Sequence, residues 1–208
     1  MANPTRHPVD QDARQKLRAI IERLSLRRDR VFKLASGRES NYFFDLKPTL
    51  LDPEGINLIA DAVVREAAAL GAQCIGGRAM GAVPIVIAAV LKSASTDQPL
   101  RGFWVRKEVK DHGAQSKADG HIVPGSRVAV VEDVTTTGGT VQKVIELVRE
   151  MGAKPIGVAA IADRSGGKVT FDVPFYSLLK LNLWTYEPDF CPLCKAGTVA
   201  EKPGSSKK

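Results

Sequence analysis

Two patterns of apolar residues alternate along the middle of the chain. Short continuous apolar runs, of the kind that form strands buried on both faces, lie at 73–76, 101–105, 128–131, 156–162 and 175–179. Between them are segments that predict helices packed on a sheet, at 56–67, 82–91 and 141–148. Strands that alternate with helices favour an α/β fold, here a mainly parallel sheet of roughly five strands flanked by helices.

Capping residues mark the ends of two of these helices. Asp52 followed by Pro53 predicts a helix start, because the aspartate side chain can accept from free N–H groups and proline fits the first helical position. Gly71 and Gly152 stand where helices should end, since glycine readily takes the left-handed conformation of a C-terminal cap.

The first fifty residues do not follow the alternation of strands and helices. A helical stripe of Leu17, Ile20, Ile21 and Leu24 precedes residues 31–46, which predict two short strands around a Ser-Gly turn. We therefore expect residues 10–50 to form a small N-terminal hood of helix and hairpin, and residues 51–196 to form the core. The aperiodic ends predict a flexible tail at 1–9 and a disordered tail at 197–208.

The stretch from Val128 to Thr140 joins a predicted buried strand to a predicted helix. Glu132 and Asp133 end the strand, and a loop rich in threonine and glycine leads into the helix. Backbone N–H groups at a helix start suit a phosphate, and neighbouring carboxylates suit sugar hydroxyls. These two preferences together predict a ribose 5-phosphate site. The glycine spacing matches neither a Walker A loop nor a dinucleotide-binding fingerprint.

A second polar segment follows the strand predicted at 101–105. Residues 106–127 have no helical stripe, and four potential cations open them: Arg106, Lys107, Lys110 and His112. A solvated charged loop is one interpretation, and a cationic lid that closes over a pyrophosphate is the other. Polar stretches follow four of the strands, at 77–81, 106–112, 132–140 and 163–164. In parallel sheets ligands bind at the carboxyl ends of strands, so we expect one shared site there.

Composition narrows the class of protein. The 208 residues are 44% hydrophobic and 25% charged, and no apolar run is long enough to cross a membrane. No signal peptide is apparent and the three cysteines form no disulfide framework, so we expect a cytoplasmic protein.

The net charge of +7 fits a polyanionic small substrate. The sequence lacks the interleaved basic and aromatic residues of a nucleic-acid surface. Cys191 and Cys194 have the spacing of half a zinc site, without two further ligands, so no protein-held metal is predicted.

These motifs also resemble a known family. Residues 132–140 resemble the motif with which type I phosphoribosyltransferases bind phosphoribosyl pyrophosphate (PRPP). Arg-Lys-Glu-x-Lys-x-His at 106–112, Ser-Gly-Arg-Glu-Ser-x-Tyr-Phe-Phe at 36–44 and Asp163-Arg164 extend the likeness to the orotate phosphoribosyltransferases, from about residue 31 to 194. The resemblance implies a type I phosphoribosyltransferase fold. It also implies conversion of orotate and PRPP to orotidine 5′-monophosphate and pyrophosphate in pyrimidine biosynthesis, with Mg²⁺ bound mainly through PRPP.

The resemblance implies roles for individual residues as well. It assigns catalysis to Arg106, Lys107, Lys110, His112 and Asp133. It assigns PRPP binding to Arg106, Lys107, Lys110, His112, Glu132, Asp133, Val134, Thr135, Thr136, Thr137, Gly138, Gly139 and Thr140. It assigns orotate binding to Phe43, Phe44, Thr136 and Arg164. For the two phenylalanines a core position is an equal alternative. For Arg164 the alternative is a structural ion pair, and carboxylate binding is favoured. The family is a homodimer whose lid reaches the neighbouring site, which implies that Lys107 acts in trans.

The chain departs from the commonest bacterial pattern at two lysines. Ala35 replaces one, and the turn at 77–81 lacks another, where Arg78 is the nearest cation. These departures concern the phosphate contacts more than the activity. Two other functions are alternatives: transfer to a different base, and a PRPP-sensing regulator without catalysis. The lid motif and Asp163-Arg164 argue against the first. The short segment before the hairpin argues against the second, because it is too small for a winged-helix domain.

Overall fold

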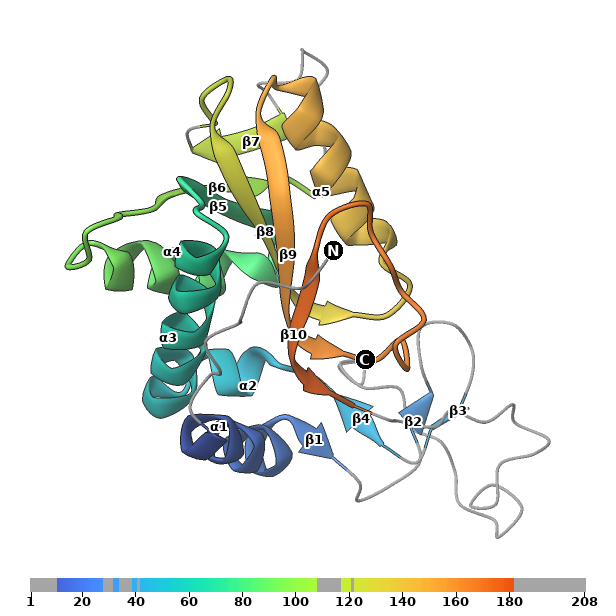
Figure 1. Cartoon of the computed structure of the whole chain (residues 1–208). Coiled ribbons are helices and arrows are strands. Elements are labelled where there is room, and N and C mark those ends of the chain that lie inside the picture. Colours follow the sequence, from blue (N-terminus) through green and yellow to red (C-terminus); the bar gives the residue numbers. More distant parts are fainter. Residues whose placement is uncertain are drawn as a thin grey trace, which may run out of the picture.

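A six-stranded sheet forms the centre of the protein (Figure 1). This computed structural model describes residues 11–27, 32–33, 39–40, 42–107, 117–120 and 122–181. In sheet order the strands are β10 (Phe175–Lys180), β9 (Lys154–Asp163), β8 (Arg127–Thr135), β5 (Cys74–Arg78), β6 (Arg101–Val105) and β7 (Ala118–Gly120). The first five in this order are parallel, which confirms the predicted sheet.

The sixth strand, β7, was not predicted. It pairs antiparallel with β6 and lies within the segment for which no regular structure was expected. Its three residues are too few to show an alternating pattern, and only pairing with β6 makes them a strand.

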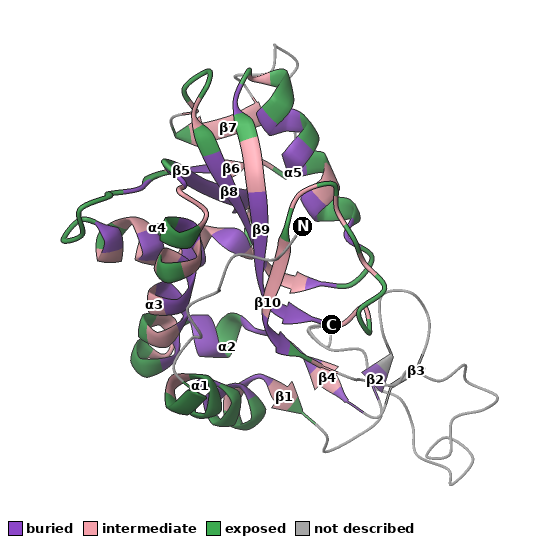
Figure 2. Ribbon diagram, in the orientation of Figure 1, coloured by how far each residue is buried: buried purple, intermediate pink, exposed green. Residues whose placement is uncertain are grey.

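Helices cover both faces of the sheet, as the alternating pattern indicated. Alternate residues of β8 point to opposite faces. Ala129 and Val131 pack in one apolar cluster with α3 (Pro53–Ala69) and α4 (Ala82–Ser93). Val128 and Val130 pack in a second cluster with α5 (Gly139–Glu150). Figure 2 shows the resulting buried band along β8 and β9.

The N-terminal segment packs against this core. It comprises α1 (Gln11–Leu24), β1 (Leu26–Arg27), β2 (Phe32–Lys33), β3 (Glu39–Ser40), β4 (Phe43–Phe44) and α2 (Lys47–Leu50). The antiparallel pair of β2 and β3 confirms the predicted hairpin, although its turn lies outside the described residues. Leu17 and Ile21 of α1 belong to the same apolar cluster as α3, so the predicted hood shares its core with the sheet. The two predicted tails lie outside the described residues.

Capping explains where the helices begin and end. The Asp52 side chain accepts hydrogen bonds from the N–H groups of Glu54 and Gly55, at 3.1 and 2.8 Å, which confirms the predicted helix start. Gly71 and Gly152 follow α3 and α5 with φ of +69° and +75°, the left-handed conformation expected there. Among the described residues, no helix is both long and apolar enough to cross a membrane.

A glycine in β5 lets an aromatic ring fill the second cluster. Gly76 is the cross-strand partner of Phe103 in β6, whose side chain is fully buried. A Cβ atom at position 76 would lie 2.2 Å from the phenyl ring, far closer than two carbon atoms can approach. The ring therefore occupies the space that any larger residue at this position would need.

We predict that Gly76→Ala lowers the free energy of unfolding by about 1–3 kcal/mol, because overpacking forces the buried ring to move. Urea unfolding of the purified protein measures the change. Phe103→Leu supplies the control, since it removes the clashing atoms. The double variant should lose less stability than the sum of the two single variants, and additive losses would contradict this account.

Candidate active site

The carboxyl ends of four neighbouring strands meet at one edge of the sheet. The described polar residues that follow β5, β6, β8 and β9 lie together there, as the shared-site prediction expected. A Cβ atom at Gly81 would lie 2.5 Å from the Asp133 carboxylate, so the turn after β5 contacts β8. Arg78 Nη2 donates to the Lys107 carbonyl at 3.3 Å. The Arg164 N–H donates to the Thr135 carbonyl at 2.8 Å, which joins β9 to β8.

Strand β8 is longer than the sequence indicated. The apolar run suggested an end near Val131, but the strand continues through Glu132 and Asp133 to Thr135. Thr135 pairs with Asp163 of β9 and is 2% exposed, so it is a strand residue and not part of the loop. Parallel pairing on β9 overrides the low strand preference of the acidic pair.

The remaining loop is short and opens directly into α5. Gly138 has φ of +79° and packs against Val169 and Phe171, which makes glycine necessary there. It is also the N-terminal cap of α5, and it offers no side-chain acceptor to the first N–H groups of the helix. Thr136, Thr137, Gly139 and Thr140 are exposed around this helix start. The helix start therefore presents backbone donors and hydroxyl groups to solvent.

Glu132 and Asp133 form a closely coupled acidic pair. Glu132 is 6% exposed, and its Oε1 accepts from the Asp133 N–H at 3.3 Å. Burial, followed by the hydrogen bond and charge repulsion from Asp133, raises the pKa of Glu132 to about 8, while Arg78 opposes the shift. Glu132 therefore binds a proton far more readily than an exposed glutamate does.

Three buried polar atoms of residues near this edge have no hydrogen-bond partner. In the described part of the chain they are Glu132 Oε2, Thr135 Oγ1 and Arg164 Nε. Buried polar atoms are nearly always hydrogen-bonded, so unpartnered ones mark a place where an external group can bind. The three atoms belong to the ends of β8 and β9 or the residue that follows, which supports a polar ligand at this edge.

Arg164 is held by the N-terminal segment. Its Nη2 donates to the Tyr42 hydroxyl at 3.2 Å, and its guanidinium lies 5.5 Å from the centre of that ring. No carboxylate of the described residues pairs with Arg164, so the alternative of a structural ion pair finds no support in them. Tyr42 was not predicted as a site residue, although it lies inside the 36–44 motif.

The two predicted orotate-contacting phenylalanines have different surroundings. Phe44 is 7% exposed and belongs to the apolar cluster under α1 and α3, which is the core position that the sequence left open. Phe43 is half-buried, with its ring 5.6 Å from that of Phe32. Of the pair, only Phe43 keeps part of its side chain accessible to a ligand.

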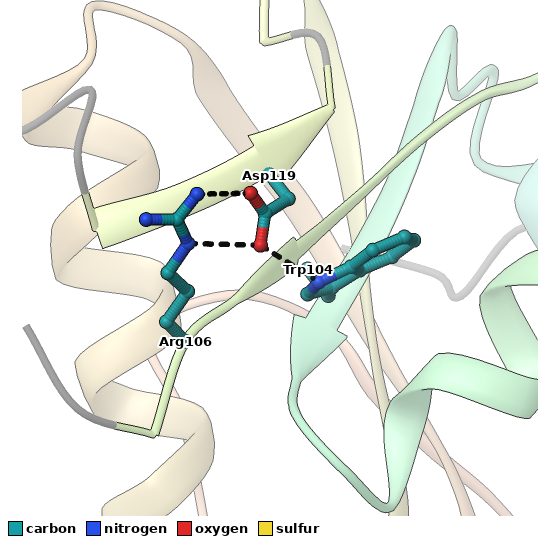
Figure 3. Close-up of polar contacts among 3 residues, drawn as sticks. All are labelled: Trp104, Arg106 and Asp119. Atoms are coloured by element: carbon teal, nitrogen blue, oxygen red, sulfur yellow. Dashed lines mark hydrogen bonds and ion pairs between the residues drawn. The ribbon is translucent and has the colours of Figure 1, made fainter.

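Arg106, at the start of the predicted lid, is bound to a partner that the sequence did not reveal. Its Nε donates to Asp119 Oδ2 at 2.9 Å and its Nη2 donates to Oδ1 (Figure 3). Trp104 Nε1 also donates to Oδ2, at 3.1 Å. The guanidinium lowers the pKa of Asp119, and the carboxylate raises that of Arg106. Asp119 follows no motif and is brought here only by β7.

The other predicted lid residues are less constrained or are not described. Lys107 is exposed, and its backbone carbonyl accepts from Arg78. Lys110 and His112 lie outside the described residues, as do Ala35, Cys191 and Cys194. Among the residues with described positions, no three His, Cys, Asp or Glu side chains gather as a metal site.

Comparison with known proteins identifies the family. Residues 59–191 match the family model described as "Phosphoribosyl transferase domain". The orotate phosphoribosyltransferase of Thermotoga maritima is 40% identical over 192 residues, which cover 91% of this chain and 97% of the relative. That of Aquifex aeolicus is 41% identical over 175 residues, which cover 81% of this chain and 96% of the relative.

Solved structures agree with the sequence relatives. Mycobacterium tuberculosis orotate phosphoribosyltransferase in complex with Fe(III) dicitrate superposes with a TM-score of 0.71 and 31% identity, covering 81% of this chain and 97% of that one. The same enzyme in complex with PRPP gives 0.63 and 25%, covering 87% and 92%. This chain therefore belongs to the orotate phosphoribosyltransferase family.

Proposed function

We propose that this protein transfers the 5-phosphoribosyl group of PRPP to orotate, giving orotidine 5′-monophosphate and pyrophosphate, a step of pyrimidine biosynthesis. The observation that carries the proposal is the set of buried polar atoms without a partner in Glu132, Thr135 and Arg164, at the carboxyl ends of β8 and β9. We propose a cytoplasmic location as well.

The start of α5 is proposed to hold the 5-phosphate of PRPP. Its first N–H groups and the hydroxyls of Thr136, Thr137 and Thr140 are suited to phosphate oxygens, and the helix dipole favours negative charge there. Gly138 keeps this turn free of a side chain that would compete for the N–H groups. The neighbouring carboxylates of Glu132 and Asp133 then accept hydrogen bonds from the ribose hydroxyls.

When pyrophosphate leaves the ribose C1 atom, the site must stabilise the charges that develop on both groups. Positive charge develops on the sugar ring and negative charge on the leaving group. Asp133 stabilises the ring charge, while Arg106, Lys107, Lys110 and His112 stabilise the pyrophosphate. Arg78 adds a cation at the same edge, where the family's usual lysine is missing. Mg²⁺ bound mainly through PRPP would neutralise further charge on the leaving group.

Orotate is proposed to bind beside Arg164. The orotate carboxylate can accept from the unpartnered Arg164 Nε, since guanidinium groups bind carboxylates side-on. The Tyr42 hydroxyl accepts from Nη2 of the same guanidinium. Thr136 and Phe43 are proposed to contact the flat ring of orotate.

A homodimer with shared lids is also proposed. Three large apolar side chains are exposed on α4 and in the turn before it: Met80 at 71%, Ile87 at 54% and Leu91 at 77%. Ile87 and Leu91 are four residues apart on one helix, so they lie on the same face. Met80 belongs to the turn that contacts Asp133 through Gly81. A second copy that covers this apolar surface would lie beside the site, where its own Lys107 can reach it.

Turnover tests the proposed function directly. Orotate absorbance should fall when the protein is mixed with PRPP, Mg²⁺ and orotate, and chelation of Mg²⁺ should stop the loss. Uracil, adenine and hypoxanthine should not be converted, because they lack the carboxylate that Arg164 binds. Conversion of one of those bases would assign a different transferase, and PRPP binding without any turnover would assign a regulator.

Lys107→Ala should abolish turnover while PRPP binding largely survives, because the lysine acts on the leaving group and the α5 start holds the phosphate. Single-turnover kinetics and a PRPP titration measure the two quantities. Lys154→Ala is the control, since this exposed lysine starts β9 at the opposite edge of the sheet and should turn over normally.

Mixed subunits distinguish action in trans from action in cis. When Lys107→Ala subunits are recombined with Asp133→Asn subunits, each mixed dimer has one intact site if the lysine comes from the neighbour. About a quarter of wild-type activity should then return at equal ratios. No recovery in verified mixed dimers would place Lys107 in its own subunit's site.

Glu132 should make the stability of the ligand-free protein depend on pH. The folded protein holds this proton up to a pH of about 8, whereas the unfolded chain releases it near 4.5. The contribution of Glu132 is therefore complete below pH 4.5 and is lost as the pH rises toward 8. Melting temperatures between pH 5 and 9 should fall more for the wild type than for Glu132→Gln. Glu146→Gln, on an exposed face of α5, should behave like the wild type, and parallel curves for wild type and Glu132→Gln would contradict the assignment.

A further inference from the structure

We infer that Asp119 is a positioning residue for Arg106, which it holds in the orientation that receives the pyrophosphate group of PRPP. The inference rests on the proposed function and adds a residue that the family motif does not contain. Asp119 lies outside both the 106–112 motif and the 132–140 motif.

Pairing of β6 with β7 brings the three residues together. Trp104 and Asp119 are cross-strand partners, so their side chains leave the sheet on the same face. The Arg106 N–H donates to the Lys117 carbonyl at 2.9 Å, which extends the pairing by one more residue. Arg106 is two residues beyond Trp104, and its side chain therefore points to the same face. The Asp119 carboxylate accepts hydrogen bonds from both Trp104 and Arg106, as Figure 3 shows.

The backbone around Asp119 leaves the carboxylate little freedom to move. Gly120 has φ of +99°, and a Cβ atom there would lie 2.4 Å from the Gly102 carbonyl oxygen. This close approach fixes β7 on β6 in a single register. On the other side of Asp119, Lys117 Nζ pairs with Glu150 of α5 at 3.1 Å. Asp119 is thus held in place by contacts on both sides of it, before any ligand arrives.

The hydrogen bonds to Asp119 use only one edge of the guanidinium. Nε and Nη2 donate to the carboxylate, while Nη1 points away from it (Figure 3). The Arg106 and Asp119 side chains are 37% and 35% exposed, so an anion in solution can reach the free edge. Arginine has five N–H donors in a rigid plane, and a carboxylate that binds one edge aims the others. The family motif assigns Arg106 to pyrophosphate binding. The guanidinium N–H groups that Asp119 does not bind are therefore oriented before PRPP arrives.

Asp119 could instead weaken PRPP binding by competing for Arg106, and the two roles predict opposite effects of its removal. If Asp119 only neutralised Arg106 and competed with the substrate, its removal would strengthen PRPP binding. If it positions Arg106, its removal frees the guanidinium to sample many rotamers, and PRPP is used less well.

Steady-state kinetics of Asp119→Asn and Trp104→Phe test the inference. Asp119→Asn removes the charge and one acceptor, and kcat/KM for PRPP should fall on the order of 10-fold, with KM for orotate unchanged. Trp104→Phe removes the N–H donor that orients Asp119 and keeps an aromatic ring, and it should give a smaller loss of kcat/KM for PRPP. In an Arg106→Ala background, Asp119→Asn should cause no further loss, because the residue being positioned is gone.

Asp172→Asn provides the matched control. It breaks another partly exposed Arg–Asp pair, between Arg149 Nη2 on α5 and Asp172 Oδ2 in the loop between β9 and β10, at 2.6 Å, and should leave KM for PRPP unchanged. Unchanged or tighter PRPP binding by Asp119→Asn, or losses that add to those of Arg106→Ala, would overturn the inference. A wild-type protein that neither binds PRPP in a calorimetric titration nor consumes orotate would instead overturn the proposed function.

Discussion

Parallel pairing of β8 with β5 on one side and β9 on the other is the constraint on which the site depends. Because the three strands run in the same direction, their carboxyl ends reach one edge of the sheet together. Glu132, Asp133 and Thr135 are members of β8 itself, so they are positioned by the same backbone hydrogen bonds that hold the sheet together. Any loss of this pairing would separate the acidic pair from Arg164 and from the turn at Gly81.

The same strand passes from an apolar core to a polar site within a few residues. Val128 to Val131 are buried among aliphatic side chains, and the next residue is an equally buried carboxylic acid. Burial raises the pKa of Glu132 and leaves one of its oxygens without a partner, both of which are unfavourable in the ligand-free protein. Active sites commonly retain such local instability, because a bound ligand then supplies the missing hydrogen bonds.

Segments far apart in the sequence complete the site around β8. Tyr42 of the N-terminal segment holds Arg164, which follows β9. Arg78 at the end of β5 reaches the backbone of Lys107, beyond β6. Asp119 in β7 holds Arg106. Each contact joins two chain segments through a side chain and a precise backbone position, so the arrangement requires the complete fold.

The sequence alone determined the elements whose signals are local. The apolar run at 101–105 coincides with β6, and Asp52-Pro53 marks the start of α3, since strand burial and helix capping depend on neighbouring residues. The motif at 132–140 and the lid motif likewise indicated the family through the order of their residues. Only the tertiary structure decided that β8 extends to Thr135, that Phe44 lies in the core, and that Asp119 and Tyr42 bind the two arginines. The physical reason is the same in each case: these outcomes depend on pairing and packing between segments distant in the chain, which leave no periodic pattern in the sequence.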